Sequence, residues 1–360
     1  MSGVYLRRKE VNINRVLLII LAPLGDTLFT TPAIRALRER YSRAEITALV
    51  WDSNHEMLKG NPDINHLVVC PESWKLPQII SSLHEQEFDL AVGLSNLGSF
   101  ILPFCPAEYK IGFKSRSLGI FYDEDVPDDR NIHAIDYCLG IVEAVGARTN
   151  NHVPRFYYQE EDRELAADYL AQHGFQPGNF VAIHPGGKFF TRKRWPLKNY
   201  SELIRAFGEE MHLPVIIIGG PGDWGLAEEI IQRGGVGLNA AGQLGIKETG
   251  ALLHMARLFV GNDSAPLHIA SALGVHSIGL FGPTDPDNFA PRGKNAHIIR
   301  KKLFCNPCFR WLGMPWQYFP TLHRDCDGNC MEVITVDDVM NKASQILKGS
   351  GNLEDRVFFG

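Results

Sequence analysis

Asp263 and Ser264 follow the apolar run 258–260 after a Gly-Asn pair, and Pro266 comes two residues later. Proline is favoured in the first turn of a helix, where its missing N–H costs nothing, so we expect a strand to end here and a helix to begin. The free N–H groups and the dipole of such a helix attract anions, which makes the turn a seat for a phosphate or diphosphate. His268 lies one helical turn beyond Ser264, close enough to assist. An ordinary Asp or Ser helix cap without a ligand is the alternative.

Asp26 is a second carboxylate near the end of an apolar run. It follows Gly25 shortly after the run 16–21 and precedes the helical pattern 31–40. A carboxylate placed there can take a proton from a hydroxyl nucleophile, provided that its surroundings hold its pKa in a useful range. The same position also suits a helix cap, so the residues leave both roles open.

The segment 184–196 combines a glycine pair with a cationic loop. Gly186 and Gly187 follow the apolar run 180–184, and the absence of side chains there lets a ligand approach the backbone closely. Lys193, which lies between two arginines, can neutralise a diphosphate and stabilise it as it leaves. A solvated basic loop is the alternative.

A glycine pattern that formally matches a dinucleotide-binding turn follows the apolar run 214–218. Its glycines are Gly220, Gly222 and Gly225. The fingerprint also requires an acidic residue about 20 positions later, and the region 238–242 contains none. A nicotinamide- or flavin-dependent oxidoreductase is therefore the weaker reading, and we expect Asp223 to reach a ribose hydroxyl instead.

Four of the seven cysteines cluster near the C-terminus, at Cys305, Cys308, Cys326 and Cys330. In a reducing compartment such clustering favours a metal over disulfides, and the spacing of the first pair is the usual chelating one. The ligand type predicts a structural metal site, with zinc as the first choice and iron also compatible. Reduced thiols in a compact cap are the alternative.

Short apolar runs alternate with helical patterns along the chain, twice over. The runs are 16–21, 45–50, 67–70 and 90–94, then 180–184, 214–218, 258–260 and 277–281. The helical patterns are 31–40 and 76–87, then 199–211, 224–232, 247–255 and 266–273. Such alternation predicts an α/β protein with two doubly wound, Rossmann-like domains, each built on a parallel sheet covered on both faces. Because ligands of these domains bind at the carboxyl ends of the strands, Asp26 and the turn at Asp263 should face a shared interdomain cleft.

The alternating pattern breaks between Ala147 and Asp162, and 360 residues suit two domains. We expect an N-terminal domain over 1–160, a C-terminal domain over 161–348 that includes the Cys-rich segment 305–330, and a tail at 349–360. The net charge of −5 does not suggest a nucleic-acid partner. No apolar run approaches the roughly 20 residues that span a bilayer, which predicts a cytoplasmic protein without a transmembrane segment.

Taken together, these stretches resemble glycosyltransferase family 9, the ADP-heptose:lipopolysaccharide heptosyltransferases. The matching blocks are spread in order over nearly the whole chain: 25–26 with 30–33 and Arg35, 184–186, 193–196, 261–264 with His268, and 280–286. Ala265 stands where the family usually has glycine, and backbone donation survives this change if φ is negative there. The Cys-rich segment resembles only a subset of the family.

The resemblance implies a GT-B fold and an inverting transfer of heptose from ADP-heptose to the inner core of lipopolysaccharide, either Kdo-lipid A or a heptosylated core. It makes Asp26 the general base and Lys193 the lysine that contacts the diphosphate. The residues expected on the donor side, besides Lys193, are His184, Gly186, Gly187, Asp223, Asp263, Ser264, Ala265 and His268. Those expected on the acceptor side are Gly25, Thr27 and Thr30.

No cofactor is expected for catalysis itself, because a cation and a helix dipole can stabilise the leaving diphosphate. The expected partners are a nucleotide diphosphate sugar and a glycolipid acceptor, which would bring the protein to the inner face of the inner membrane. Two alternatives within the fold are a glycosyltransferase that uses another nucleotide sugar and a protein heptosyltransferase. An NAD-dependent oxidoreductase has less support.

Overall fold

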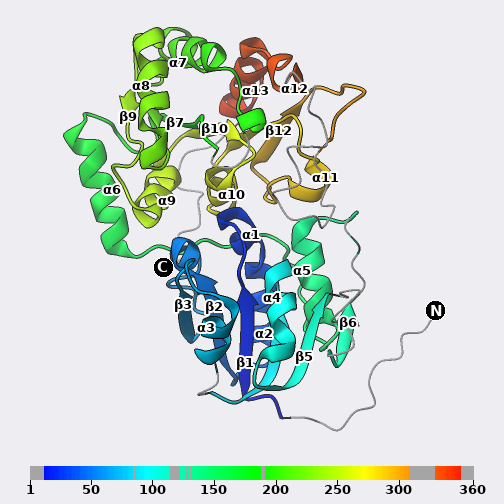
Figure 1. The fold of residues 1–360 in the computed structure, drawn as a ribbon. Helices are drawn as coiled ribbons and strands as arrows, with labels where there is room; N and C mark the ends of the chain where they lie inside the picture. Colours follow the sequence, from blue (N-terminus) through cyan, green and yellow to red (C-terminus); the bar gives the residue numbers. More distant parts are fainter. Residues whose placement is uncertain are drawn as a thin grey trace.

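The structure is a computed structural model that describes residues 12–83, 86–113, 122–126, 129, 131–187, 191–308 and 329–349. It contains two six-stranded sheets, each with its own helices, which we call the N-terminal and C-terminal lobes (Figure 1). Every strand pairing in both sheets is parallel. In the part of the chain that is described, no helix is long and apolar enough to cross a bilayer.

The N-terminal sheet has the order β3-β2-β1-β4-β5-β6. Its strands are β1 (Arg15–Ile20), β2 (Glu45–Trp51), β3 (His66–Cys70), β4 (Phe88–Gly93), β5 (Ala107–Phe113) and β6 (Glu124–Val126). Val16 of the central strand pairs with Ile46 on one side and with Leu90 on the other. All residues of β1 after Arg15 are buried, because helices cover both faces of this strand.

The helices of this lobe are α1 (Leu24–Phe29), α2 (Thr31–Arg40), α3 (Leu76–Ser81), α4 (Asn96–Ile101) and α5 (Ala134–Glu143), with short 3₁₀ segments η1 (Asp52–Met57) and η2 (Leu102–Phe104). Apolar residues of α2 and α5 pack with Val16 and Leu18 on one face of β1. Residues of α3 and α4 pack with Leu17 and Ile19 on the other. The period-two alternation of β1 thus serves two separate apolar layers.

The C-terminal sheet has the order β12-β11-β10-β7-β8-β9. Its strands are β7 (Val181–His184), β8 (Val215–Ile217), β9 (Leu238–Asn239), β10 (Leu258–Asn262), β11 (Ser277–Phe281) and β12 (Ala296–Arg300). The helices are α6 (Glu160–Gln172), α7 (Leu197–Met211), α8 (Trp224–Gly234), α9 (Ile246–Met255), α10 (Ala265–Ala272), α11 (Pro286–Phe289), α12 (Asn329–Glu332) and α13 (Val336–Gly349). Two 3₁₀ segments, η4 (Thr191–Lys193) and η5 (Pro221–Asp223), lie in its loops.

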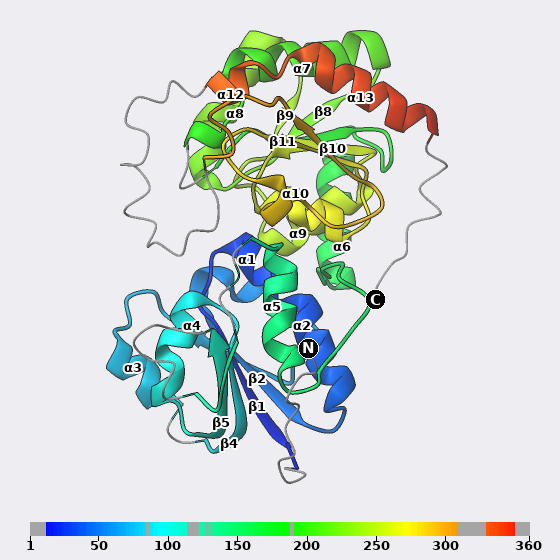
Figure 2. The same ribbon diagram turned by 90° about the vertical axis from the view of Figure 1, so that its right-hand side faces the viewer.

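Both sheets share one winding order, in which the first strand of each lobe lies between its second and its fourth. The order therefore reverses between β1 and β4 in one sheet and between β7 and β10 in the other. In open parallel sheets, ligands bind beyond the carboxyl ends of the strands at such a reversal. The helices that follow β1 and β10 at these points are α1 and α10, and they pack against each other between the lobes (Figures 1 and 2).

The two lobes share apolar packing. One continuous cluster of buried side chains includes Val16 and Leu37 of the first lobe together with Leu252 and Leu267 of the second. The chain crosses between the lobes after α5, and α6 already packs on α9 of the C-terminal lobe. The exact domain limits at 160 and 348 remain a prediction. Helix α13 ends at Gly349, so the proposed tail beyond it lies outside the described residues.

Candidate active site

Asp26 lies in the first turn of α1, directly beyond the carboxyl end of β1. The N-cap position of this helix, Pro23, has no side-chain cap, so the capping role that the sequence left open is not what fixes the turn. Two buried hydroxyls fix it instead. Thr27 Oγ1 donates to Pro23 O at 3.0 Å, and Thr30 Oγ1 donates to Thr27 O at 2.7 Å. Thr27 and Thr30 therefore support the turn that carries Asp26, while their predicted contact with an acceptor stays a prediction.

Burial raises the pKa of Asp26 from 3.8 to about 6. The positive charges of Lys193 and His268 oppose this rise, and the negative charge of Asp263 adds to it. All three of these residues belong to the C-terminal lobe, so charges across the lobe boundary adjust the pKa that burial raises. A carboxylate with a pKa near 6 is ionised at neutral pH and is a stronger base than an ordinary aspartate.

Partly exposed Lys193 forms a polar cluster with buried Asp263 and His268 in the lobe opposite Asp26. Lys193 Nζ lies 2.6 Å from Asp263 Oδ2, and His268 Nε2 lies 3.3 Å from Asp263 Oδ1. Burial by itself would raise the pKa of Asp263, but the charge of Lys193 and the hydrogen bond from His268 hold it well below its usual range. Asp263 is therefore a permanent anion that orients one cation and one imidazole.

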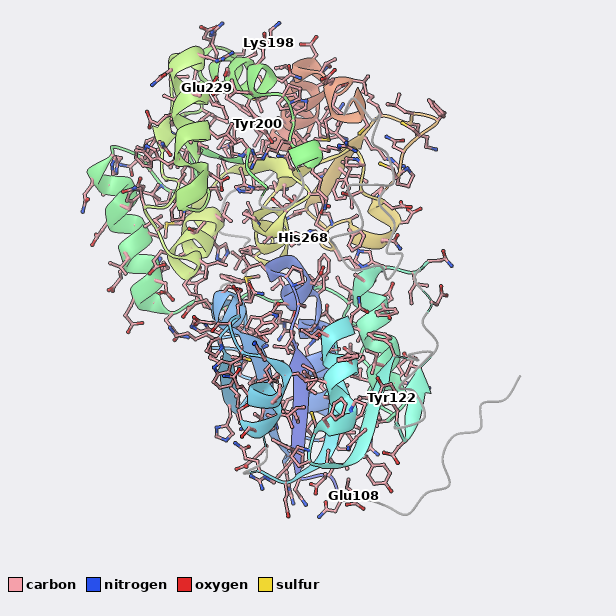
Figure 3. All side chains as sticks on the ribbon, viewed as in Figure 1. Glu108, Tyr122, Lys198, Tyr200, Glu229 and His268 are labelled. Carbon is pink, nitrogen blue, oxygen red and sulfur yellow. The ribbon has the colours of Figure 1, made fainter. Side chains whose placement is uncertain are left out.

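The His268 side chain of the C-terminal lobe packs against α1 of the N-terminal lobe. A Cβ added to Gly25 would lie 3.6 Å from His268 Cδ2, and the Phe29 ring meets the imidazole edge-on at a centroid distance of 4.6 Å. Figure 3 shows His268 at the junction between the two lobes. Its Nδ1 is buried and has no hydrogen-bond partner among the described residues. One donor or acceptor position in this cluster thus remains available to a bound molecule or water.

Asn262, which the sequence analysis did not single out, holds the loops of the C-terminal site together. Its Nδ2 donates to Pro185 O at 3.0 Å, and its Oδ1 accepts from the Trp195 backbone N–H at 3.1 Å and from Tyr200 OH at 2.9 Å. This amide is 1% exposed and links the glycine loop after β7 to the basic loop that carries Lys193. Asn262 ends β10 and belongs to the family-matching block 261–264, but nothing in the sequence indicated that it holds two loops together.

Ser264 is the N-cap residue of α10, but its hydroxyl does not cap the helix. It lies 2.9 Å from His184 Nδ1 and donates to Asn262 O at 3.2 Å instead. Helix α10 begins at Ala265 with Pro266 in its first turn, as the sequence predicted. The first N–H groups of α10 are therefore not capped by the serine side chain, and the positive end of the helix lies beyond the carboxyl end of β10.

Asp223 folds back onto the glycine loop. Its carboxylate accepts from the Gly220 N–H at 3.0 Å, and Oδ2 lies 3.7 Å from His184 Nε2. The contact with His184 is the largest cause that lowers the pKa of Asp223. A Cβ at Gly186 would come within 2.4 Å of Asp223 Oδ1, so a larger residue there would displace the Asp223 carboxylate. The predicted contact of Asp223 with a ribose stays a prediction.

The dinucleotide-type glycine pattern does not occupy the position that such a site requires. It follows β8, whereas the fingerprint belongs to the first strand-to-helix turn of a sheet, which here follows β7. An added Cβ at Gly222 or at Gly225 would meet nothing within 4 Å, so neither glycine is needed for close packing. The pattern is a chance match on this geometry.

The cysteine cluster is described only in part. Cys326 lies outside the described residues, Cys305 is exposed and Cys330 is buried. The Cys308 N–H donates to Pro283 O at 3.1 Å, and a Cβ at Gly282 would lie 3.0 Å from Cys330 Sγ. Cys308 and Cys330 therefore flank the same turn after β11, although the described residues contain no complete group of metal ligands.

Comparison with known proteins agrees with this architecture. The family model of glycosyltransferase family 9, described as heptosyltransferase, matches residues 77–313, about two thirds of the chain. Lipopolysaccharide heptosyltransferase 3 of Escherichia coli strain K12 is 28% identical over 357 residues, which cover 92% of this chain and 98% of that protein.

Two solved structures share the fold. A family 9 glycosyl transferase from Veillonella parvula superposes with a TM-score of 0.79 at 21% identity, covering 94% of this chain and 100% of that one. The E. coli ADP-heptose lps heptosyltransferase II gives 0.74 at 19% identity, covering 93% and 98%. The predicted α/β fold with two parallel, doubly wound sheets, typical of GT-B heptosyltransferases, is confirmed.

Proposed function

The chain belongs to glycosyltransferase family 9, and from this premise we propose that it transfers heptose from ADP-heptose, with inversion, to the inner core of lipopolysaccharide. The acceptor would be Kdo-lipid A or an already heptosylated core. One observation carries the proposal: the charges of Lys193, Asp263 and His268 in one lobe act on the carboxylate of Asp26 in the other. The names of relatives that act on lipopolysaccharide and use ADP-heptose support the choice of donor and acceptor.

In the proposed reaction, Asp26 takes the proton of the acceptor hydroxyl. The resulting oxygen nucleophile forms a bond to the anomeric carbon while the bond from that carbon to the diphosphate breaks, and ADP leaves with the electron pair. A carboxylate whose pKa is about 6 suits this task, because it is ionised at neutral pH and still binds a proton well enough to remove one. The oxygen attacks opposite the leaving group, which inverts the configuration.

Positive charge for the leaving diphosphate would come from Lys193 and the N-terminus of α10. Both lie beyond the carboxyl ends of β7 and β10, where the strand order reverses. Lys193 is held by Asp263 at 2.6 Å, so its ammonium group is already oriented before the donor binds. Such preorganised charge stabilises the transition state without a cost of reorientation at the moment of reaction.

We further propose that Cys305, Cys308, Cys326 and Cys330 hold a structural zinc or iron ion. Cys308 and Cys330 are separated by 22 positions and yet flank one turn, at Gly282 and Pro283. Four thiolates are a suitable ligand set for either metal. The ion would tie the segment after β12 to the C-terminal lobe and would take no part in the transfer.

The acceptor would bring the enzyme to the inner face of the inner membrane as a peripheral protein. The function is tested with purified protein, a panel of ADP-, UDP- and GDP-sugars, and Kdo-containing or heptosylated glycolipid. We expect ADP release only with ADP-heptose and an acceptor heavier by one heptose in the mass spectrum. Transfer from a UDP- or GDP-sugar would replace the donor assignment, and a glycosylated protein in place of a glycolipid would replace the acceptor.

A further inference from the structure

A seam of polar contacts joins the lobes beside the candidate site. It connects the N-terminal end of α5 with the segment between β11 and β12, which contains α11, and these elements face each other across the lobe boundary (Figure 1). We use the word seam for four of the side chains there: His133, Asp136, Asn288 and Arg292. His152 lies beside them, 2.8 Å from Asp136 Oδ1 and 3.1 Å from Arg292 Nη1. Asn288 Nδ2, for example, donates to Ile132 O at 2.8 Å.

The imidazole ring of His133 makes one hydrogen bond in each lobe. Its Nδ1 accepts the Ile135 N–H at 3.1 Å and so caps α5, while its Nε2 lies 2.8 Å from Ala290 O in the C-terminal lobe. Because a carbonyl oxygen only accepts, Nε2 carries the hydrogen and Nδ1 does not. Burial lowers the pKa of His133 to about 4, which agrees with a neutral ring in this tautomer.

Arg292 and Asp136 form a two-pronged ion pair across the boundary. Arg292 Nη1 donates to Asp136 Oδ1 at 2.8 Å, and its Nη2 donates to Asp136 Oδ2. Burial by itself would raise the pKa of Asp136, but hydrogen bonds from Arg292 and His152 lower it. A planar guanidinium held at two points fixes both distance and orientation, which a single contact does not.

The seam also contacts the element that carries the proposed base. The His133 ring lies 5.9 Å from that of Phe29, three residues beyond Asp26 on α1, and Phe29 packs edge-on against His268. On the other side of the boundary region, Lys247 of α9 donates to the carbonyls of Lys59 at 2.7 Å and Tyr157 at 2.5 Å. Polar contacts thus join the lobes at these two places, in addition to the apolar cluster that the lobes share.

We propose that the seam sets the distance between Asp26 and the Lys193–Asp263–His268 cluster, and that His133 and Arg292 are positioning residues for sugar transfer. This inference rests on the proposed function. None of the four seam side chains belongs to the proposed donor set, so their loss should leave nucleotide binding to the C-terminal lobe intact. Loss of the seam should instead displace α1, and an error of about 1 Å in the reacting groups can cost up to 100-fold in rate.

The test compares Arg292→Ala, His133→Phe and the exchange of Arg292→Asp with Asp136→Arg. Arg233→Ala is the matched control, because Arg233 pairs with Glu229 inside α8 and not across the lobes. For each variant we would measure kcat for transfer, the dissociation constant for ADP by calorimetry, and the radius of gyration by small-angle scattering. The His133→Phe ring keeps its place beside Phe29 but loses both hydrogen bonds.

We expect Arg292→Ala to lower kcat by about tenfold to 100-fold, to change ADP affinity by less than about twofold, and to enlarge the radius of gyration. The charge exchange should recover much of the lost kcat, and Arg233→Ala should match the parent. Parental kcat and radius of gyration in Arg292→Ala and His133→Phe would overturn the proposal, as would a fall in ADP affinity that matches the fall in kcat.

Failure of the proposed function would be recognised separately, because the parent would then transfer no heptose. The scattering comparison would still decide whether the seam fixes the lobes: an unchanged radius of gyration in Arg292→Ala refutes it. Should Arg292→Ala fail to fold, Asn288→Ala removes one hydrogen bond and leaves the ion pair, and a smaller change in the same direction is expected.

Discussion

The Asp26→Asn variant should be more stable than the parent and yet less active. The proposed reaction needs the Asp26 carboxylate, but the fold disfavours the charge of that carboxylate. The folded-state pKa of about 6 lies above the ordinary value of 3.8, so the folded protein binds this proton more tightly than the unfolded chain. The stabilisation that this gives is complete below pH 3.8 and is lost as the pH rises through about 6. At pH 8, ionised Asp26 therefore lowers the stability of the fold.

The size of this effect follows from the pKa. A rise from 3.8 to about 6 corresponds to at most about 3 kcal/mol at 1.36 kcal/mol per pKa unit, because partly exposed Asp26 keeps some contact with solvent. Asparagine has nearly the same shape and no charge, so it removes the cost of burying the ion. We expect Asp26→Asn to raise the free energy of unfolding at pH 8 by up to about 3 kcal/mol and the melting temperature by about 5 °C.

The measurement is urea or thermal unfolding of parent and variant at pH 8 and again near pH 4. The difference should be large at pH 8 and should shrink towards pH 4, where Asp26 is protonated in the folded parent as well. Asp168→Asn, on the exposed side of α6, is the matched control and should change stability at neither pH. Asp26→Asn should also lose at least about 100-fold in kcat while binding ADP nearly as well as the parent.

Two results would refute this reasoning. If Asp26→Asn is less stable than the parent at pH 8, the charge of Asp26 is favoured in the fold and the sign of its pKa change is wrong. If the variant turns over at close to the parental rate, Asp26 is not the base. In the parent, kcat/KM should fall as the pH drops below about 6, because protonation of Asp26 removes the base.

Three further predictions concern the other parts of the structure. Lys193→Ala should weaken ADP binding at least about tenfold in calorimetry, because the donor site loses a cation and Asp263 keeps only His268 as a partner. Unchanged affinity would remove Lys193 from the donor site. Gly98→Ala should destabilise the fold by about 2 kcal/mol or more in urea unfolding, because the new Cβ would lie 2.4 Å from Ile19 O. The control Gly140→Ala in α5, where the Cβ meets nothing within 4 Å, should stabilise the fold by about 0.5–1 kcal/mol. Equal effects of the two substitutions would contradict the close packing of Gly98 on β1. Elemental analysis should find about one zinc or iron per chain and much less in Cys330→Ser; equal metal in both would exclude Cys330 as a ligand.

Some elements could be predicted closely because their apolar pattern is local. The strand at Ser277–Phe281 and the helix at Thr31–Arg40 have the bounds that the pattern predicted. Strands β5 and β12 were missed, because each is only partly buried and lacks a continuous apolar run. The helix predicted to reach residue 87 ends at Ser81, since a buried apolar face does not show by itself where a helix ends.

For the candidate site, too, the sequence indicated some residues but not the contacts that they make. Asp26, Lys193 and Asp263 could be selected from the sequence, because a charged residue after an apolar strand and before a helix is a local signal. The side chains that contact these residues could not be selected from the sequence. Asn262 ties two loops together, Asp223 faces His184, and Asp263 holds both Lys193 and His268. These contacts join residues up to 77 positions apart.

The amino-acid sequence by itself determined which strands and helices alternate, the parallel character of both sheets, and the residue types at the ends of the strands, because each of these depends on neighbouring residues. Only the tertiary structure decided which side chains of the two lobes come together, and with them the pKa of Asp26, which burial raises and three residues of the other lobe adjust. The physical reason is that burial and electrostatic interaction act through space. The seam of His133, Asp136, Asn288 and Arg292 belongs to the same class, because no pattern within α5 or α11 indicates that these two helices meet.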